Sequence, residues 1–287
     1  MTGSGYTLDL GGVRAVAGRL GLWPAGVTVD LFSGLGNQLF QYCFARILAE
    51  RHGLALRCRF VPPSGGVLHS NRRLAVREVF DVATRAPGRT ATGRPRRLGG
   101  HAVDLEALDG TRPLHLHGFF QQYRYYRPYR RSIASWLSVA AVELPSVDPE
   151  AVAVHVRLGD YLSAIRERPY AFRPRYYDEA IDRAGGGPVV VVTDEPAHPT
   201  IEHLRRRHGA AVVSSADPYE DFRRLMAHRR LVTSESTFCW WAGWLGRAER
   251  IVQPPRALDP AVYGGFWSDR EDIDLFVDDD DRYVNLG

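Results

Sequence analysis

The chain has 287 residues, of which 45% are hydrophobic and 24% charged, and this composition excludes an intrinsically disordered protein. The formal net charge of +4 is compatible with anionic substrates and too small to indicate a nucleic-acid binder. Three cysteines without CxxC spacing indicate neither a disulfide framework nor a zinc site. Because no segment approaches the roughly 18 apolar residues of a membrane span and no signal-peptide pattern is visible, we expect a cytoplasmic protein, with a peripheral position at the inner membrane face as the alternative.

The first predicted unit is a strand, a glycine turn and a helix. Residues 27–32 are apolar and β-branched, and an amphipathic helix is expected over 39–52. This layout directs backbone N–H groups and the positive end of a helix at an anion, and a second strand over 54–60 completes a βαβ unit. The dinucleotide-binding fingerprint needs a third glycine where this chain has Leu39, which disfavours a nicotinamide-dependent oxidoreductase.

Residues 62–110 lose this regularity. Arginines in the stretch 85–97 lie among Gly, Pro and Thr, which is typical of a solvated loop, and contact with an anionic glycan or lipid surface is the functional alternative. Alternation returns over 114–119, where His115 and His117 share one face of a strand. No third metal ligand is near them, so we interpret both as structural histidines.

The second half alternates regularly between strands and helices. After a helix over 121–137 and a linker at 145–149, a buried strand begins at Ala151. Further strands are predicted at 188–193, 211–214, 231–233 and 250–253, and helices at 173–184, 198–208, 219–228 and 236–245. This alternation predicts an α/β fold with a parallel, doubly wound sheet. The acidic run 278–281 is predicted to be a solvated tail.

The strand that begins at Ala151 carries polar groups at its C-terminal end, where open α/β sheets bind ligands. Arg157 is a permanent cation whose planar donors suit phosphate oxygens, and His155 shares its face of the strand. Asp160 follows in the turn. A surface salt bridge between Arg157 and Asp160 explains this stretch alone equally well.

A late helix starts with residues that suit an anion. Ser236 and Thr237 place hydroxyls beside the free N–H groups of the helix start. An ordinary N-cap explains this turn when it is taken alone. Together with Arg157 at a neighbouring strand end, phosphate binding is the favoured interpretation.

Five motifs, taken in order, resemble glycosyltransferase family eleven, whose members are mostly α-1,2-fucosyltransferases. The motifs are Gly34-Leu-Gly-Asn-Gln-Leu-Phe-Gln-Tyr42, Gly118-Phe-Phe-Gln-Gln-Tyr123, His155-Val-Arg-Leu-Gly-Asp-Tyr161, Thr193-Asp-Glu-Pro196, and Leu225-Met226 through Ser236-Thr-Phe-Cys-Trp-Trp241. Any one of them is a weak signal, but the ordered set is specific.

The resemblance implies a GT-B fold, with two Rossmann-like domains and a donor-binding cleft between them. We expect an acceptor-side domain over 1–146 and a donor-binding domain over 147–287. The implied activity is an inverting transfer of L-fucose from GDP-fucose to an acceptor hydroxyl, such as that of a galactoside through an α-1,2 linkage, without a metal or other cofactor. The implied partners are a nucleotide sugar and a glycan or glycosylated small molecule.

The resemblance also implies roles for single residues. Arg157 would hold the β-phosphate, His155 would lie against the nucleotide, and Asp221 would recognise guanine. The other donor-binding residues would be Gly34, Gly36, Asn37, Asp194, Ser236, Thr237 and Phe238. The base for the acceptor hydroxyl stays open among three carboxylates, of which the first is favoured: Asp160, Glu167 and Glu235.

Two positions depart from the family pattern. Leu158 stands where a second Arg is common, and Glu235 stands where Asn usually precedes the Ser-Thr-Phe run. A carboxylate beside a diphosphate is repulsive unless it points elsewhere, so a GDP-sugar other than GDP-fucose is one alternative. The other is a non-catalytic nucleotide- or glycan-binding protein on the same scaffold.

Overall fold

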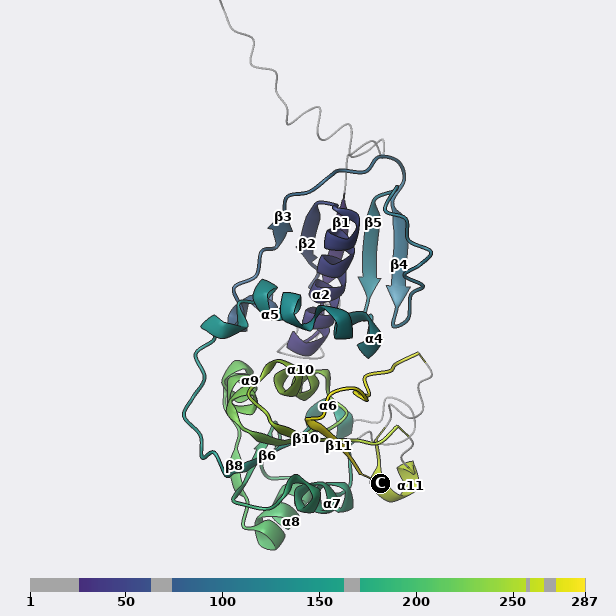
Figure 1. Cartoon of the computed structure of the whole chain (residues 1–287). Coiled ribbons are helices and arrows are strands. Elements are labelled where there is room, and N and C mark those ends of the chain that lie inside the picture. Colours follow the sequence, from purple (N-terminus) through teal and green to yellow (C-terminus); the bar gives the residue numbers. More distant parts are fainter. Residues whose placement is uncertain (1–25, 63–73, 163–170, 257–258, 266–271, 287) are drawn as a thin grey trace, which may run out of the picture. The chain divides into compact units, whose positions relative to one another are not determined.

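A computed structural model describes residues 26–62, 74–162, 171–256, 259–265 and 272–286, and its secondary structure is mixed α/β (Figure 1). The described chain forms two compact units. Unit 1 consists of the described parts of Met1–Leu31, Gln41–Val61 and Ala83–Phe120, and unit 2 of those of Phe32–Phe40, Pro62–Val82 and Gln121–Gly287. The predicted domain division after residue 146 stays a prediction.

Unit 1 is built on a five-stranded sheet with the strand order β3-β2-β1-β5-β4, in which only β2 and β3 pair antiparallel. The strands are β1 (Val27–Leu31), β2 (Leu56–Phe60), β3 (Arg85–Ala86), β4 (Arg96–Gly100) and β5 (Leu114–Gly118). Helix α2 (Leu35–His52) lies across one face of the sheet (Figure 1). Alternate residues of β1, such as Val27 and Val29, are fully buried and form the core of this unit.

The prediction of a solvated loop over the stretch 85–97 is wrong for part of that stretch. Arg96–Gly100 forms the edge strand β4, which pairs in parallel with β5 through five residues. A hydrophobicity pattern does not predict this strand, because its side chains are exposed or half-buried. The strand is instead stabilised by its main-chain hydrogen bonds to β5. A short helix, α3 (Val76–Val79), lies earlier in the irregular range 62–110 and belongs to unit 2.

Unit 2 contains a six-stranded sheet with the order β11-β10-β9-β6-β7-β8, and all of its pairs are parallel. Its strands are β6 (Val152–Val156), β7 (Val189–Thr193), β8 (Ala211–Val213), β9 (Arg230–Val232), β10 (Arg250–Gln253) and β11 (Tyr283–Asn285). Its longer helices are α7 (Pro174–Ala184), α8 (Pro199–His208), α9 (Pro218–Ala227) and α10 (Thr237–Leu245). Shorter ones are α4 (Tyr123–Tyr126), α5 (Arg130–Trp136), α6 (Gly159–Leu162) and α11 (Pro260–Tyr263).

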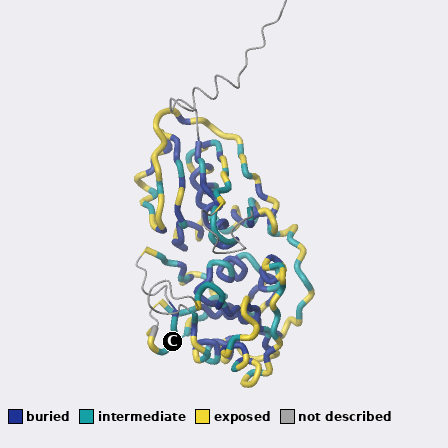
Figure 2. Tube along the Cα trace, turned by 180° about the vertical axis from the view of Figure 1, so that it is seen from behind, coloured by how far each residue is buried: buried dark blue, intermediate teal, exposed yellow. Residues whose placement is uncertain are grey.

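The central strand β6 is buried along its whole length between β7 and β9. A continuous apolar run is what a parallel strand covered on both faces requires. Buried residues concentrate in the strands and in the inner sides of the helices, while exposed residues follow the loops (Figure 2). The predicted alternation of strands and helices is therefore confirmed. The predicted helix over 121–137 is divided into α4 and α5, because Pro128 lies in a 3₁₀ turn between them, Arg127–Tyr129.

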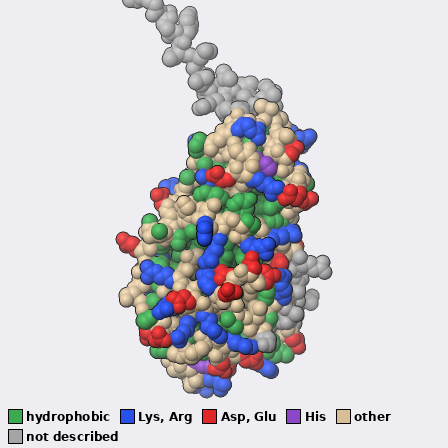
Figure 3. All heavy atoms as spheres, viewed as in Figure 1, with side chains coloured by type: hydrophobic (Ala, Val, Ile, Leu, Met, Phe, Trp, Pro, Cys, Tyr) green, Lys and Arg blue, Asp and Glu red, His purple; other side chains and the backbone are tan. Residues whose placement is uncertain are grey.

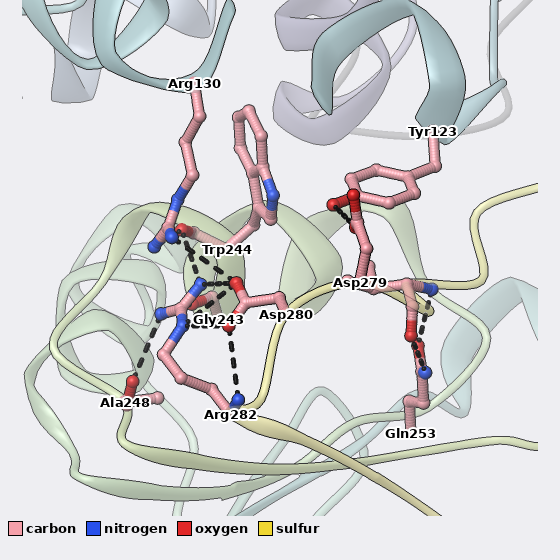
Figure 4. A network of polar contacts seen from close by, with 10 residues as sticks. Tyr123, Arg130, Gly243, Trp244, Ala248, Gln253, Asp279, Asp280 and Arg282 are labelled. Atoms are coloured by element: carbon pink, nitrogen blue, oxygen red, sulfur yellow. Dashed lines mark hydrogen bonds and ion pairs between the residues drawn. The ribbon is translucent and has the colours of Figure 1, made fainter. Parts of the chain in front are cut away.

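The prediction of a solvated acidic tail over Asp278–Asp281 is wrong in part: Asp278, Asp279 and Asp281 are exposed, but the run is not a free tail. The run leads into β11, which pairs with β10 at the edge of the sheet. Asp280 forms ion pairs with Arg282 at 2.8 Å and with Arg130 at 3.3 Å (Figure 4). The adjacent Arg282 and the distant Arg130 thus hold a segment whose composition alone predicts solvation.

The same network reaches the end of helix α10. The guanidinium of Arg282 donates to the main-chain oxygens of Trp244 at 3.3 Å and Ala248 at 3.1 Å (Figure 4). These carbonyls lie at and after the last turn of α10, where a helix has no partners of its own for them. The C-terminal segment therefore stabilises α10.

The surface shows no large area of one charge sign on the face seen in Figure 3, where basic and acidic side chains are interspersed. This agrees with the small net charge of +4. Of the helices in the described residues, none is both long enough and apolar enough to span a membrane.

Candidate active site

One cavity of unit 2 brings together the residues that the sequence predicts for the site. Its walls come from the C-terminal ends of β6 and β7, the starts of α9 and α10, and the turn before α2 together with the first turn of that helix. It is lined by Gly34, Gly36, Asn37, His155, Arg157, Asp160, Asp194, Asp221, Ser236, Thr237 and Phe238. The carboxyl ends of parallel strands are the expected place for a ligand in such a sheet.

Arg157 follows β6 and forms two ion pairs. Its Nη2 lies 2.5 Å from Oδ1 of Asp160, and its Nη1 lies 2.7 Å from Oδ2 of Asp194. Burial alone would lower the pKa of Arg157, but the two carboxylates raise it, so the guanidinium stays charged. The predicted bridge to Asp160 is present, and Asp194 adds a second one.

Asp194 also fixes the turn that carries Arg157. Its Oδ1 accepts a hydrogen bond of 2.9 Å from the N–H of Leu158. A Cβ on Gly159 would lie 2.5 Å from Oδ2 of Asp194, so a side chain at this position would force the carboxylate to shift. The side chain of Leu158 is fully buried in the core, on the opposite side of the strand from Arg157.

His155 presents a neutral ring to the cavity. Its Nδ1 lies 2.8 Å from the Oγ of Ser234, and its ring stacks on Phe238 with centroids 5.7 Å apart. Burial, with the neighbouring charge of Arg157, lowers the pKa of His155 to about 3. The residue is therefore uncharged at neutral pH and suited to packing against a ligand.

The start of α10 and the start of α2 form a continuous wall. The Oγ of the N-cap Ser236 accepts a hydrogen bond of 3.3 Å from the N–H of Phe238. A Cβ on Gly36 would lie 2.5 Å from the carbonyl carbon and Oγ1 of Thr237, so this close approach requires glycine. Asn37 also lines this wall, and its side-chain amide donates a hydrogen bond of 2.8 Å to the Oγ of Ser33.

Asp221 on α9 is a buried carboxylate that can accept a further hydrogen bond. It is 8% exposed, and its Oδ2 accepts a hydrogen bond of 3.2 Å from the N–H of Ser215. Its Oδ1 has no hydrogen-bond partner among the described residues, and burial raises the pKa of this carboxyl group. Since the residue lines the cavity, a ligand with N–H donors would satisfy it.

Glu235 does not line this cavity. Its side chain is buried and lines a second cavity of unit 2, together with Gln253 and Arg256. Only its main-chain oxygen turns toward the first site, where it accepts a hydrogen bond of 2.9 Å from the hydroxyl of Tyr161. The expected repulsion between Glu235 and a diphosphate is thereby avoided, and Glu167 lies outside the described residues.

Two tyrosines line the cavity without having been assigned a role from the sequence. Tyr161 lies beside Arg157, whose guanidinium carbon is 5.6 Å from the ring centroid. Tyr219 follows the proline that starts α9. The first stands inside a recognised motif and was open to prediction, whereas nothing in its local pattern distinguishes the second from a core aromatic residue.

Comparison with known proteins agrees with this geometry. A family model described as Glycosyl transferase family 11 matches residues 91–257, more than half of the chain. The match includes Arg157, Asp194, Asp221 and Ser236 and begins after the glycine turn at Gly34. No curated protein matches the chain.

Proposed function

Because the chain belongs to glycosyl transferase family 11, we propose that it is an inverting, metal-independent transferase that moves L-fucose from GDP-fucose to an acceptor hydroxyl on a GT-B scaffold. The proposed acceptor is a galactoside, joined through an α-1,2 linkage. One observation carries the proposal. A single cavity combines a cation, a helix N-terminus and a buried carboxylate with an unsatisfied oxygen, which match the diphosphate and the base of a guanosine nucleotide.

The diphosphate explains the basic side of the cavity. Breaking the bond to the sugar leaves negative charge on the diphosphate, and Arg157 with the N–H groups at the start of α10 can compensate it. Asp194 also holds the N–H of Leu158, so in this proposal it stays in place while the diphosphate takes the position of Asp160 on the guanidinium.

Guanine explains the acidic side. Its N1–H and amino group form a pair of donors, and the Oδ1 of Asp221 offers the missing acceptor. Adenine and uracil lack such a pair, so they would leave this buried oxygen unsatisfied. The neutral ring of His155 and the ring of Phe238 supply flat apolar surface beside the nucleotide.

The test is the release of GDP from GDP-fucose in the presence of EDTA, with a panel of galactosides. Release over many turnovers that rises with one acceptor supports the donor, metal independence and acceptor class together. Tight binding of GDP without turnover of GDP-fucose would support the nucleotide site and contradict fucose as the donor sugar, or it would favour the non-catalytic alternative. Failure to bind GDP at all would contradict the proposal.

A further inference from the structure

The ring of His155 is hydrogen-bonded to the protein on one edge. It is buried, and the contact of 2.8 Å between its Nδ1 and the Oγ of Ser234 is the one hydrogen bond that the ring forms with the described residues. One face of the ring stacks on Phe238. The other edge, which carries Nε2, is open to the donor cavity that the residue lines. What this edge offers a ligand depends on which ring nitrogen carries the proton.

The ring has a single N–H proton at neutral pH. Burial and the neighbouring charge of Arg157 lower the pKa of His155 to about 3, so the imidazole is neutral. A neutral imidazole donates a hydrogen bond from one nitrogen and accepts one at the other. If Nδ1 accepts from the hydroxyl of Ser234, then Nε2 carries the proton and is a donor. If Nδ1 donates to that hydroxyl, then Nε2 is an acceptor.

The surroundings of Ser234 decide between these two tautomers. The residue is 4% exposed, so its hydroxyl hydrogen needs an acceptor within the protein. Two side-chain acceptors are near it: Nδ1 of His155 at 2.8 Å and Sγ of Cys239 at 3.7 Å. Sulfur is a weak acceptor and the distance to it is long, whereas 2.8 Å is a favourable length for a hydrogen bond from a hydroxyl. The hydroxyl therefore donates to Nδ1.

Cys239 has hydrogen-bond partners in the main chain. Its thiol lies 3.4 Å from the main-chain oxygen of Ser234 and 3.3 Å from that of Ser236, and it donates toward them. Burial raises the pKa of this thiol to about 11, so it stays protonated and keeps its hydrogen. The thiol is thus satisfied without the hydroxyl of Ser234, which leaves that hydroxyl to the ring of His155.

A donor at Nε2 also matches the rest of the cavity. Arg157 and the start of α10 both line the same space, and both favour negatively charged oxygens. An acceptor nitrogen would place its lone pair against such oxygens, whereas an N–H adds one more hydrogen bond to them. Because the ring is neutral well below neutral pH, this donor does not depend on the protonation of His155.

We propose that Ser234 is a positioning residue that fixes His155 as the Nε2–H tautomer, so that Nε2 donates a hydrogen bond to an oxygen of the bound nucleotide. The identity of that ligand rests on the proposed transferase function, whereas the tautomer does not. The proton stays on Nε2, and no proton is transferred. Ser234 does not line the donor cavity, so it acts on the ligand through His155.

The first experiment determines the tautomer in the ligand-free protein by NMR. In protein labelled with nitrogen-15 at histidine, protonated and unprotonated ring nitrogens give separate signals, and couplings to the ring hydrogens identify each nitrogen. The signals of His155 are those that disappear in His155→Gln. We expect a protonated Nε2 and an unprotonated Nδ1 at neutral pH. A protonated Nδ1 in wild type would overturn the proposal, whatever the activity of the protein.

Variants of three buried residues separate positioning from packing, with thermal unfolding as the check that each folds. Ser234→Ala removes the hydroxyl, and we expect mixed tautomers and a GDP affinity lower by about 10-fold or more. Ser234→Thr keeps a hydroxyl and should retain both properties. Cys239→Ala removes the competing sulfur and should change neither. Thr233→Val is the matched control, because it removes a neighbouring buried hydroxyl that donates to the main-chain oxygen of Val252.

Guanosine measured beside GDP locates the accepting oxygen. A greater loss for GDP than for guanosine in Ser234→Ala assigns it to the diphosphate, and an equal loss assigns it to the ribose. If Ser234→Ala lowers GDP affinity while the tautomer of His155 is unchanged, Ser234 contributes only packing and the proposal is wrong. If wild type has the Nε2–H tautomer but does not bind GDP, the tautomer stands, and the proposed function and the contact to a nucleotide are wrong.

Discussion

Replacing Arg157 by alanine is the most informative test of the donor site, because the change acts in two ways. It removes the cation proposed to hold the diphosphate, and it leaves the carboxylates of Asp160 and Asp194 without the guanidinium that lies 2.5 Å and 2.7 Å from them. Loss of one preorganised charge-stabilising group costs about 3–4 kcal/mol, or roughly 100–1000-fold in rate. The two uncompensated carboxylates would add repulsion toward the diphosphate.

A triple variant separates the two effects. Arg157→Ala combined with Asp160→Asn and Asp194→Asn has the same loss of the cation without the added negative charge. The turn does not need the negative charge of Asp194, because the amide oxygen introduced by Asp194→Asn can still accept from the N–H of Leu158. We expect kcat/KM of the triple variant to lie between those of Arg157→Ala and wild type.

The assay is steady-state GDP release with GDP affinity by calorimetry, and thermal unfolding checks that each variant folds. Near wild-type kcat/KM for Arg157→Ala would refute the assignment of the phosphate site. Equal losses in the single and triple variants would show that repulsion by the two carboxylates contributes nothing measurable.

Three further predictions concern the walls of the same cavity. Asp221→Asn should weaken GDP binding by about 10-fold or more without improving ADP binding, because hydrogen bonds to a charged group are worth about 1.5–3 kcal/mol; unchanged calorimetric affinity would exclude guanine recognition by this residue. Gly36→Ala should lower both Tm and GDP affinity, since the new Cβ would lie 2.5 Å from Thr237, and an unchanged Tm would show that the turn can move. For His155, the unfolded state binds a proton below the ordinary pKa of 6.5 and the native state does so only near 3, so the free energy of unfolding should decrease as the pH falls through this window. Urea titrations of His155→Gln should show a weaker decrease, and an identical pH dependence would contradict the assignment.

The grouping of these residues around one cavity was predictable from the sequence, because several of them follow strands with strong apolar patterns. In a parallel sheet all carboxyl ends meet at one edge, so Arg157 and Asp194 were expected at the same edge, and the pairing of β6 with β7 makes them neighbours. Helix starts such as Ser236 were similarly marked by their capping residues.

What was missed depends on pairing between distant segments. The strand Arg96–Gly100 carries no hydrophobic signal and exists through its ladder to β5. The alternation of His115 and His117 was visible, but their common partner Asp30 depends on the strand order, which spacing along the chain does not reveal. The direction of the Glu235 side chain is likewise a property of the surrounding packing.

The position of β11 in the sheet has a consequence for synthesis on the ribosome. The strand pairs with β10, and Arg282, just before it, holds the end of the helix whose start forms the proposed phosphate site. Domains tend to fold as they emerge, from the N-terminus onward. A nascent chain can therefore assemble the sheet of unit 1 early, but it cannot complete the sheet of unit 2 until translation has passed Asn285. The proposed nucleotide binding should consequently require a chain that has been synthesised through β11.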